Sequence, residues 1–192
     1  MTATLTIDGH ELIPPRLTCE DVMRMVEIGV LHEGRGFELI EGVLTRMNAQ
    51  GDRYIEAVSR ILRHLARTLP DEMEVAPAPT SHLASDTMVE PDIALLRHGT
   101  LGSRITPLDI LLVIEVSAST LAYDLGKKAS LYATASVPDY WVVDLTGRRL
   151  VRHARPEGSD YREVGAGGWD EAVPLPCAPE VMLDLAALMG AR

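Results

Sequence analysis

An acidic residue, Glu115, lies inside an apolar run that covers residues 110–116. The run is β-branched and aliphatic and too short to cross a membrane, so it predicts a strand that is buried on both faces of a sheet. An ionised carboxylate in that setting is costly to bury unless a metal ion or a cation compensates it. A second acid, Asp92, lies in a similar apolar segment, residues 89–96. Two acids on two core strands, with lysines downstream, indicate a divalent-metal site.

Strand geometry sets the condition under which these two acids could act together. Alternate residues of a strand share a face, so Glu115 and Ser117 are expected to point the same way. If Asp92 lies on the neighbouring strand, both carboxylates can reach one hard cation. Mg²⁺ or Mn²⁺ favours such oxygen ligands and can activate a phosphodiester for hydrolysis. The alternative is structural: Asp92 and Glu115 would cap strand ends or pair with Lys or Arg.

The segment 124–135 has the composition of a helix and follows the Glu115 strand. Asp124 in the first turn would suit the positive end of the helix dipole, and Lys128 and Tyr132 follow on the same face. On spacing alone, the simpler interpretation is an exposed ion pair and a packing tyrosine. A helix in this position could also bring Lys128 back over the strand end, beside the metal.

Several well-known catalytic and metal-binding motifs are absent from the sequence. It has no Gly-rich phosphate loop, no G-x-S-x-G, no H-E-x-x-H and no C-x-x-C. Its 6 histidines are scattered singly, which favours surface or capping roles. Cys19 and Cys177 lie far apart and form neither a disulfide framework nor a metal knuckle, as is typical of a reducing cytoplasm.

Length and charge limit the function further. With 192 residues the chain is long enough for one domain with a substantial core. Its 28 acidic and 18 basic residues give a net charge of −10, which argues against non-specific adhesion to nucleic acid. A nucleic-acid role must therefore depend on a local basic patch or on metal ions. No secretory signal or membrane-spanning stretch is recognisable, so we expect a soluble, cytoplasmic protein.

Apolar periodicity and turn residues predict a mixed α/β order of elements. After a lead-in over residues 1–17, a single domain is expected over residues 18–192. The expected helices cover residues 19–29, 52–69, 124–135 and 181–189. The expected strands cover residues 37–47 with a bend at 41–42, a broken segment at 73–83, two core strands at 88–96 and 110–117, and a strand at 140–144 followed by a hairpin.

Five segments together resemble the PD-(D/E)xK nuclease superfamily and, more closely, the Uma-two family of endonucleases. They are FELIEG at 37–42, EPD at 90–92, VIEVS at 113–117, DLGKKASLY at 124–132 and VPDYWVVD at 137–144. The resemblance covers residues 18–164. It implies a restriction-endonuclease-like fold, with a mixed β-sheet flanked by helices. It also implies a Mg²⁺- or Mn²⁺-dependent endonuclease that acts on DNA phosphodiester bonds as a homodimer, since two active sites can address two strands.

By this resemblance Asp92 and Glu115 would be catalytic acids that bind the metal. The superfamily lysine usually lies two residues after the second acid, where this chain has Ser117. In the Uma-like pattern the lysine moves to the next helix, which points to Lys128 as the catalytic lysine, with Lys127 as the alternative.

Two further positions follow from the same resemblance. Glu38 matches an acid near the start of the family pattern and would complete the catalytic set, while Glu41 is its alternative and better suits a turn. Similar sequences carry a His in a Gly-Asp-Arg-His context at the start of the second helix, where this chain has Tyr54. If that His takes part in the chemistry, activity would be weakened. If it only supports the site, Tyr54 would replace it by packing and a hydroxyl hydrogen bond. The alternative function is therefore a catalytically weak or inactive nuclease-fold module for binding or assembly.

Overall fold

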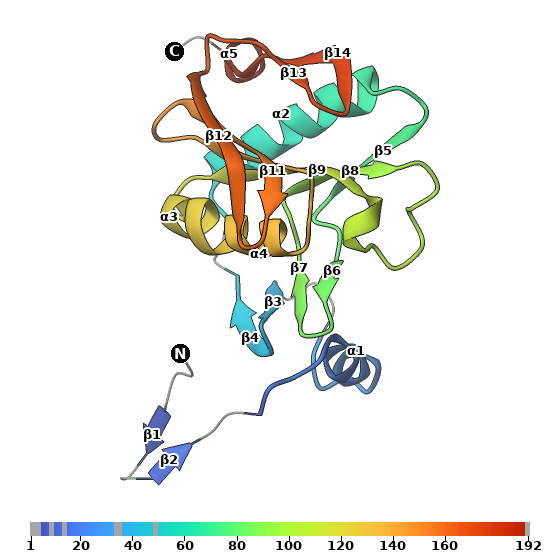
Figure 1. Ribbon diagram of the computed structural model, residues 1–192, viewed down its shortest axis with the longest axis vertical. Helices are drawn as coiled ribbons and strands as arrows, with labels where there is room; N and C mark the ends of the chain where they lie inside the picture. Colours follow the sequence, from blue (N-terminus) through green and yellow to red (C-terminus); the bar gives the residue numbers. More distant parts are fainter. Residues whose placement is uncertain (1–4, 8–9, 13–14, 33–35, 48–49, 191–192) are drawn as a thin grey trace. The chain divides into compact units, whose positions relative to one another are not determined.

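The computed structural model describes residues 5–7, 10–12, 15–32, 36–47 and 50–190, with side chains from residue 15 onward (Figure 1). The chain divides into two compact units. The first comprises Met1–Asn48 and Ala84–Val89, and the second comprises Ala49–Leu83 and Glu90–Arg192. Within the described ranges, no helix is both long and apolar enough to cross a membrane.

In the first unit, helix α1 (Cys19–Glu27) begins at the capping box that the sequence predicts. The Thr18 hydroxyl accepts the Asp21 N–H at 3.1 Å, and the Asp21 carboxylate accepts the Thr18 N–H at 2.8 Å. These two hydrogen bonds satisfy backbone donors that a helix N-terminus otherwise leaves free. The buried Val22 faces a small apolar cluster that includes Leu39 and Met88.

The strands of the first unit are short and antiparallel. β1 (Leu5–Ile7) pairs with β2 (His10–Leu12), and β3 (Phe37–Ile40) pairs with β4 (Val43–Arg46) and with β7 (Thr87–Val89). β6 (Ser81–Ala84), of which residues 81–83 belong to the second unit, leads through a turn into β7. The bend predicted at residues 41–42 is the β3–β4 turn, where Glu41 and Gly42 have φ values of 48° and 80°. Two consecutive residues with positive φ make the type of turn that matches the twist of a hairpin.

The second unit is built on a six-stranded mixed sheet with the order β12-β11-β10-β9-β8-β5. β9 and β10 are parallel, and every other neighbouring pair is antiparallel. The sheet strands are β5 (Met73–Pro77), β8 (Ile93–Arg97), β9 (Ile110–Ser117), β10 (Asp139–Asp144), β11 (Arg149–Glu157) and β12 (Asp160–Gly168). A short 3-10 turn, η1 (Pro107–Asp109), leads into β9.

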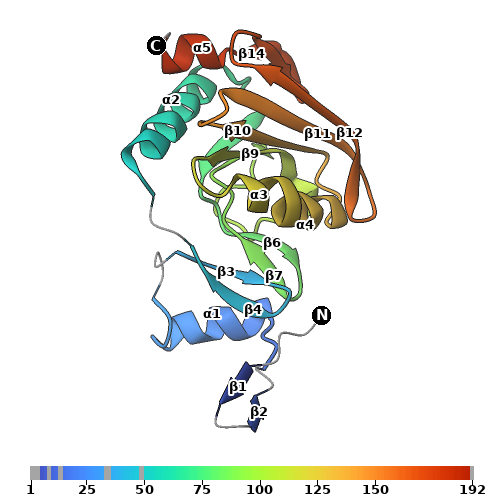
Figure 2. The same ribbon diagram turned by 90° about the vertical axis from the view of Figure 1, so that its left-hand side faces the viewer.

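Successive residues of β9 serve the two faces of this sheet. Ile114 and Val116 belong to the main core, together with the buried residues of α2 (Asp52–Thr68) and α5 (Leu185–Met189). Glu115 and Ser117 are buried too, but they lie outside that apolar cluster. Figures 1 and 2 show α2 and α5 together on one side of the sheet and α3 and α4 on the other. The predicted alternation along residues 110–117 is confirmed.

The helix after β9 contains a widened turn. It runs from α3 (Leu121–Tyr123) through the π-helical turn η2 (Asp124–Lys128) into α4 (Ala129–Thr134). The Ala129 N–H donates to the carbonyl of Asp124, five residues earlier, which is the hydrogen bond of a π turn. Such turns are rare and occur frequently at functional sites. Both Asp124 and Lys128 are buried.

Two sequence-based boundaries are wrong. The segment 88–96 is not one strand, because Pro91 has no N–H to donate to a ladder and the chain breaks there between β7 and β8. The segment 181–189 is not one helix. Val181 and Leu183 alternate inward on β14 (Ala178–Leu183), which pairs with β13 (Val173–Leu175), and only α5 is helical.

The packing of α2 gives a matched pair of isoleucine substitutions. Ile61 is 0% exposed in the core and Ile55 is 50% exposed on the same helix. We expect Ile61→Ala to lower the free energy of unfolding by about 2–5 kcal/mol, because it removes buried methyl groups and leaves a cavity. Ile55→Ala should change it by less than about 0.5 kcal/mol. Urea denaturation followed by circular dichroism measures both, and equal effects would contradict this packing.

Candidate active site

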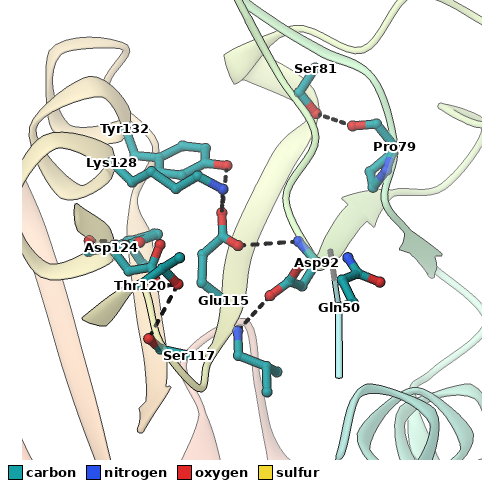
Figure 3. Close-up of polar contacts among 12 residues, drawn as sticks. Gln50, Pro79, Ser81, Asp92, Glu115, Ser117, Thr120, Asp124, Lys128 and Tyr132 are labelled. Atoms are coloured by element: carbon teal, nitrogen blue, oxygen red, sulfur yellow. Dashed lines mark hydrogen bonds and ion pairs between the residues drawn. The ribbon is translucent and has the colours of Figure 1, made fainter. Parts of the chain in front are cut away.

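Asp92 and Glu115 come together from neighbouring strands. β8 and β9 are antiparallel with Ile93 opposite Ile114, so Asp92, just before β8, lies beside Glu115. The Asp92 N–H is 3.4 Å from Glu115 Oε2, and the Val116 N–H donates to Asp92 Oδ2 at 2.7 Å. Figure 3 shows the two carboxyl groups side by side at the end of β9. The two acids are therefore neighbours on adjacent segments of the sheet, and their joint binding of a cation stays a prediction.

Glu115 is buried against two donors from the following helix. Its side chain is 2% exposed, and Lys128 Nζ lies 2.9 Å from its Oε1 atom. The Tyr132 hydroxyl donates to the same oxygen at 3.2 Å. With both donors on Oε1, the second oxygen of Glu115 is left facing Asp92 (Figure 3). The ammonium group supplies the compensation that a buried carboxylate needs.

Tyr54, at the start of α2, holds the other carboxylate. Its hydroxyl donates to Asp92 Oδ1 and accepts a hydrogen bond from Gln50 Nε2 at 2.9 Å. Burial and then the negative charge of Asp92 raise the pKa of Tyr54, so the hydroxyl keeps its proton at neutral pH. Tyr54 therefore forms the hydroxyl hydrogen bond expected for a tyrosine that stands in place of the family His.

The two carboxyl groups of Asp92 and Glu115 carry more potential negative charge than the single ammonium group of Lys128 balances. Burial, followed by the charge of Glu115, raises the pKa of Asp92 to about 8. Hydrogen bonds from Tyr54 and Val116, together with the charge of Lys128, act in the opposite direction but do not outweigh these causes. At neutral pH Asp92 therefore retains a proton in a large fraction of molecules. A cation that binds between the two acids would replace that proton.

A second polar group fixes the turn that carries Lys128. The Thr120 hydroxyl donates to Asp124 Oδ2 at 2.6 Å, and Ser117 Oγ lies 3.4 Å from the Thr120 hydroxyl (Figure 3). Burial raises the pKa of the Asp124 carboxyl group. The Tyr140 hydroxyl donates to the Asp124 carbonyl at 2.8 Å. The exposed ion pair considered for residues 124 and 128 is wrong, since both side chains are buried.

Three of the four predicted catalytic residues thus meet in the second unit, namely Asp92, Glu115 and Lys128. Glu38 is buried on β3 of the first unit, so its role beside them stays a prediction. Its alternative, Glu41, is an exposed turn residue. Lys127, the alternative to Lys128, is half-buried.

The hydroxyl contact of Tyr132 was not anticipated from the sequence, which indicated only a packing residue. Its position one helical turn after Lys128 was the available signal. Two side chains at i and i+4 on a helix can reach the same partner. Tyr132 also stacks on Tyr140, with ring centroids 4.9 Å apart, which ties the helix to the sheet.

The donor set fits a hard divalent ion with an incomplete protein shell. Within the described ranges, no group of three or more His, Cys, Asp or Glu side chains is arranged to hold a metal ion. Two adjacent carboxylates are nevertheless a common protein contribution for Mg²⁺, which keeps several of its waters. Carboxylate oxygens can also accept more than one contact, so the hydrogen bonds already formed do not exclude a cation.

The raised pKa of Asp92 predicts a pH dependence of stability. The folded protein holds a proton that the unfolded chain releases at about pH 4. The proton on Asp92 therefore stabilises the folded protein fully below about pH 4. This stabilisation is lost as the pH rises through about 8. Asp92→Asn cannot lose that proton. Thermal melts between these limits, without divalent ions, should show Asp92→Asn gaining stability relative to the unsubstituted protein as the pH rises. A constant difference would contradict the assignment.

Comparison with known proteins identifies the fold and the family of this chain. A crystal structure described as a "putative nuclease belonging to DUF820", from Anabaena variabilis, aligns with a TM-score of 0.66 at 15% sequence identity. The alignment covers 90% of this chain and 97% of that one, which shows a shared fold of mixed sheets flanked by helices. No curated protein matches the sequence. The model of the Uma2 family, described as "Putative restriction endonuclease", matches residues 20–186. The chain belongs to the Uma2 family of restriction-endonuclease-like proteins.

Proposed function

We propose that this protein is a metal-dependent endonuclease that hydrolyses phosphodiester bonds of DNA. The observation that carries the proposal is the convergence of Asp92 and Glu115 beside the ammonium group of Lys128. Buried acids with a raised pKa and a specific charged partner are typical of functional sites. The family description and the fold of the Anabaena variabilis protein support the nuclease class.

Asp92 and Glu115 are the proposed ligands for Mg²⁺ or Mn²⁺. Both ions prefer the hard oxygen donors that this pair supplies. When bound, such an ion would polarise the phosphodiester, activate a water for attack and offset negative charge in the transition state. Asp92 would give up its proton as the ion binds. The hydrogen bond from Tyr54 would keep the Asp92 carboxylate in place. Glu38 stays the fourth catalytic residue that the family resemblance predicts.

Lys128 is the proposed catalytic cation. Its ammonium group lies 2.9 Å from Glu115 Oε1, where we propose that it orients a water or balances the charge of a phosphate. Tyr132 keeps Glu115 Oε1 engaged, which directs the other oxygen toward Asp92. A buried ion pair is costly unless it is well placed and hydrogen-bonded. We infer that its retention here serves chemistry rather than stability.

One contact favours a second candidate, a catalytically weak or inactive nuclease-fold module. Tyr54 occupies the position where similar sequences carry a His, and its hydroxyl shares Asp92 Oδ1 with any incoming cation. The net charge of −10 also disfavours DNA as a general partner. Under this alternative the fold would serve binding or assembly.

A cleavage assay tests the enzymatic proposal. We expect the purified protein with Mn²⁺ to cut at least one of supercoiled, linear duplex or single-stranded DNA. Glu115→Gln should lower the rate by more than about a hundredfold, because a neutral amide is a poor metal ligand and no longer pairs with Lys128. Glu72→Gln, at an exposed position on the same unit, is the control and should cleave normally. Equal cleavage by the Glu115→Gln protein would reveal a contaminating nuclease and overturn the assignment.

Calorimetric titration with Mn²⁺ separates the two candidates. The endonuclease should bind the ion with an affinity that increases from pH 6 to about pH 8, as Asp92 releases its proton more easily. No binding at millimolar Mn²⁺, together with no DNA binding at low salt, would favour the non-catalytic module.

A homodimer is the second part of the proposal. β12 is an edge strand of the large sheet and presents Val164 at 60% exposure. Free strand edges can pair with another chain. We expect size-exclusion chromatography with light scattering to show a dimer, and Val164→Lys to shift it toward monomer. Leu108→Lys, at an 83% exposed position elsewhere, should not. A clean monomer of the unsubstituted protein at high concentration would remove this part.

A further inference from the structure

Lys127 and Lys128 are the only lysines in the sequence, and every other side chain with a permanent positive charge is an arginine. The two lysines are consecutive, so about 100° of rotation about the helix axis separates them. Only one of them can therefore face Glu115 at a time. In the structure it is Lys128, whose Nζ atom lies 2.9 Å from Glu115 Oε1, while Lys127 is half-buried. The fold therefore selects between two adjacent ammonium groups.

The widened turn η2 makes this selection. The carbonyl of its first residue, Asp124, accepts the Ala129 N–H five residues on, whereas an α turn closes four residues on. Counted from Asp124, an α turn would place residue 127 at about 300° around the axis. That is close to the position that residue 128 takes when the turn holds one more residue. Contraction of the turn would therefore exchange Lys128 for Lys127 opposite Glu115.

Tyr140, on β10, contacts the helix on both sides of the extra residue. Its hydroxyl donates to the Asp124 carbonyl at 2.8 Å, at the start of the turn. Its ring stacks on Tyr132 of α4, with ring centroids 4.9 Å apart, after the turn. Contraction of η2 would rotate Tyr132 by about 100° about the helix axis relative to Asp124. Tyr140 could not keep both contacts with a helix that lacked the widened turn.

The sheet holds Tyr140 in a fixed relation to Glu115. β10 runs parallel to β9 with Val142 opposite Glu115, so Tyr140, two residues earlier, lies on the same face of the sheet. Tyr140 is 0% exposed, and its ring also packs with the rings of His153 and Tyr161. The contacts that Tyr140 makes with the helix therefore start from a rigid position.

Thr120 holds the start of the turn as well. Its hydroxyl donates to the Asp124 carboxylate at 2.6 Å, and Ser117 Oγ lies 3.4 Å from the same hydroxyl. Figure 3 shows this group and Asp92 on opposite sides of Glu115. Thr120 can therefore be substituted without a change to either of the two acids.

We propose that Tyr140 is a positioning residue that keeps η2 in register. Lys128, rather than Lys127, then meets Glu115. The Thr120 hydroxyl supports the same register at the start of the turn. The consequence for catalysis rests on the proposed function, because it takes Lys128 as the catalytic cation. The consequence for the place of Lys128 follows from the fold and does not require an enzyme.

Two matched tyrosine substitutions test this role. Tyr140→Phe removes the hydroxyl that donates to the Asp124 carbonyl and keeps the ring. Tyr161→Phe is the control, because its hydroxyl donates to the Val137 carbonyl at 2.9 Å and its ring lies in the same buried cluster. Each variant loses one buried hydrogen bond, so we expect similar small losses of thermal stability from both.

Acetylation of the two lysines measures which ammonium group the fold protects. The folded protein is treated briefly with an N-hydroxysuccinimide ester of acetic acid, and tandem mass spectrometry assigns the acetyl groups. Lys128, in its buried ion pair, should react more slowly than Lys127. Tyr140→Phe should raise the ratio of Lys128 to Lys127 acetylation by roughly fivefold to tenfold, the effect of one lost hydrogen bond. Tyr161→Phe should leave this ratio unchanged.

DNA cleavage gives a second measurement. Tyr140→Phe should lower kcat by about tenfold to a hundredfold with KM retained, because the cation moves relative to the reacting group. Thr120→Val, which removes the hydroxyl and keeps the shape, should act in the same direction. Thr120→Ser restores the hydroxyl and should restore kcat.

The outcomes separate this inference from the proposed function. An unchanged acetylation ratio in Tyr140→Phe would overturn the inference. An equal change in Tyr161→Phe would also overturn it, since general loosening would then explain the result. If the ratio responds to Tyr140→Phe alone and the unsubstituted protein cleaves no DNA, the positioning role stands and the endonuclease proposal fails. If DNA is cleaved and the ratio does not respond, the endonuclease proposal stands and the positioning role fails.

Discussion

The ion pair between Glu115 and Lys128 is the constraint on which the rest of the site depends. A carboxylate on the central strand of a sheet is tolerated only with a compensating charge at hydrogen-bond distance. Strand β9 carries Glu115, and the helix that follows it carries Lys128. The Lys128 ammonium group lies 2.9 Å from Glu115 Oε1. Tyr132 and Tyr140 then fix that helix against the sheet through a shared stack of rings. The removal of one partner would leave a buried, uncompensated charge, so the pair constrains position as well as chemistry.

Asp92 has a different environment, although it lies beside the same partner. It receives hydrogen bonds from Tyr54 and Val116, yet burial and the nearby Glu115 still favour its protonated form. Two acids with one ammonium group therefore share the site unequally: Glu115 is paired with Lys128, and Asp92 favours its protonated form. If the proposed metal site is correct, this inequality would link cation binding to pH.

Much of this arrangement could be predicted from the sequence because it depends on local patterns. The apolar run around Glu115, the Thr18 capping box and the helical period of residues 52–69 specify a strand and two helices, and all three are present. The site required one long-range fact, the pairing of β8 with β9, which no local pattern contains. The break at Pro91 and the strand at 178–183 were missed because short apolar segments fit either a strand or a helix. The hydroxyl contact of Tyr132 was missed because spacing gives the face of a helix but not the partner of a side chain.

The widened turn η2 also decides which side chain of this helix faces Glu115. A π turn accommodates one more residue than an α turn, so every side chain after it is rotated by about 100° relative to an uninterrupted helix. The residue that faces Glu115 is therefore chosen by backbone register, and a single-codon insertion or deletion in this helix would exchange it for a neighbour. The length of the helix, and not only the residue at one position, therefore sets which side chain pairs with the acid on the strand.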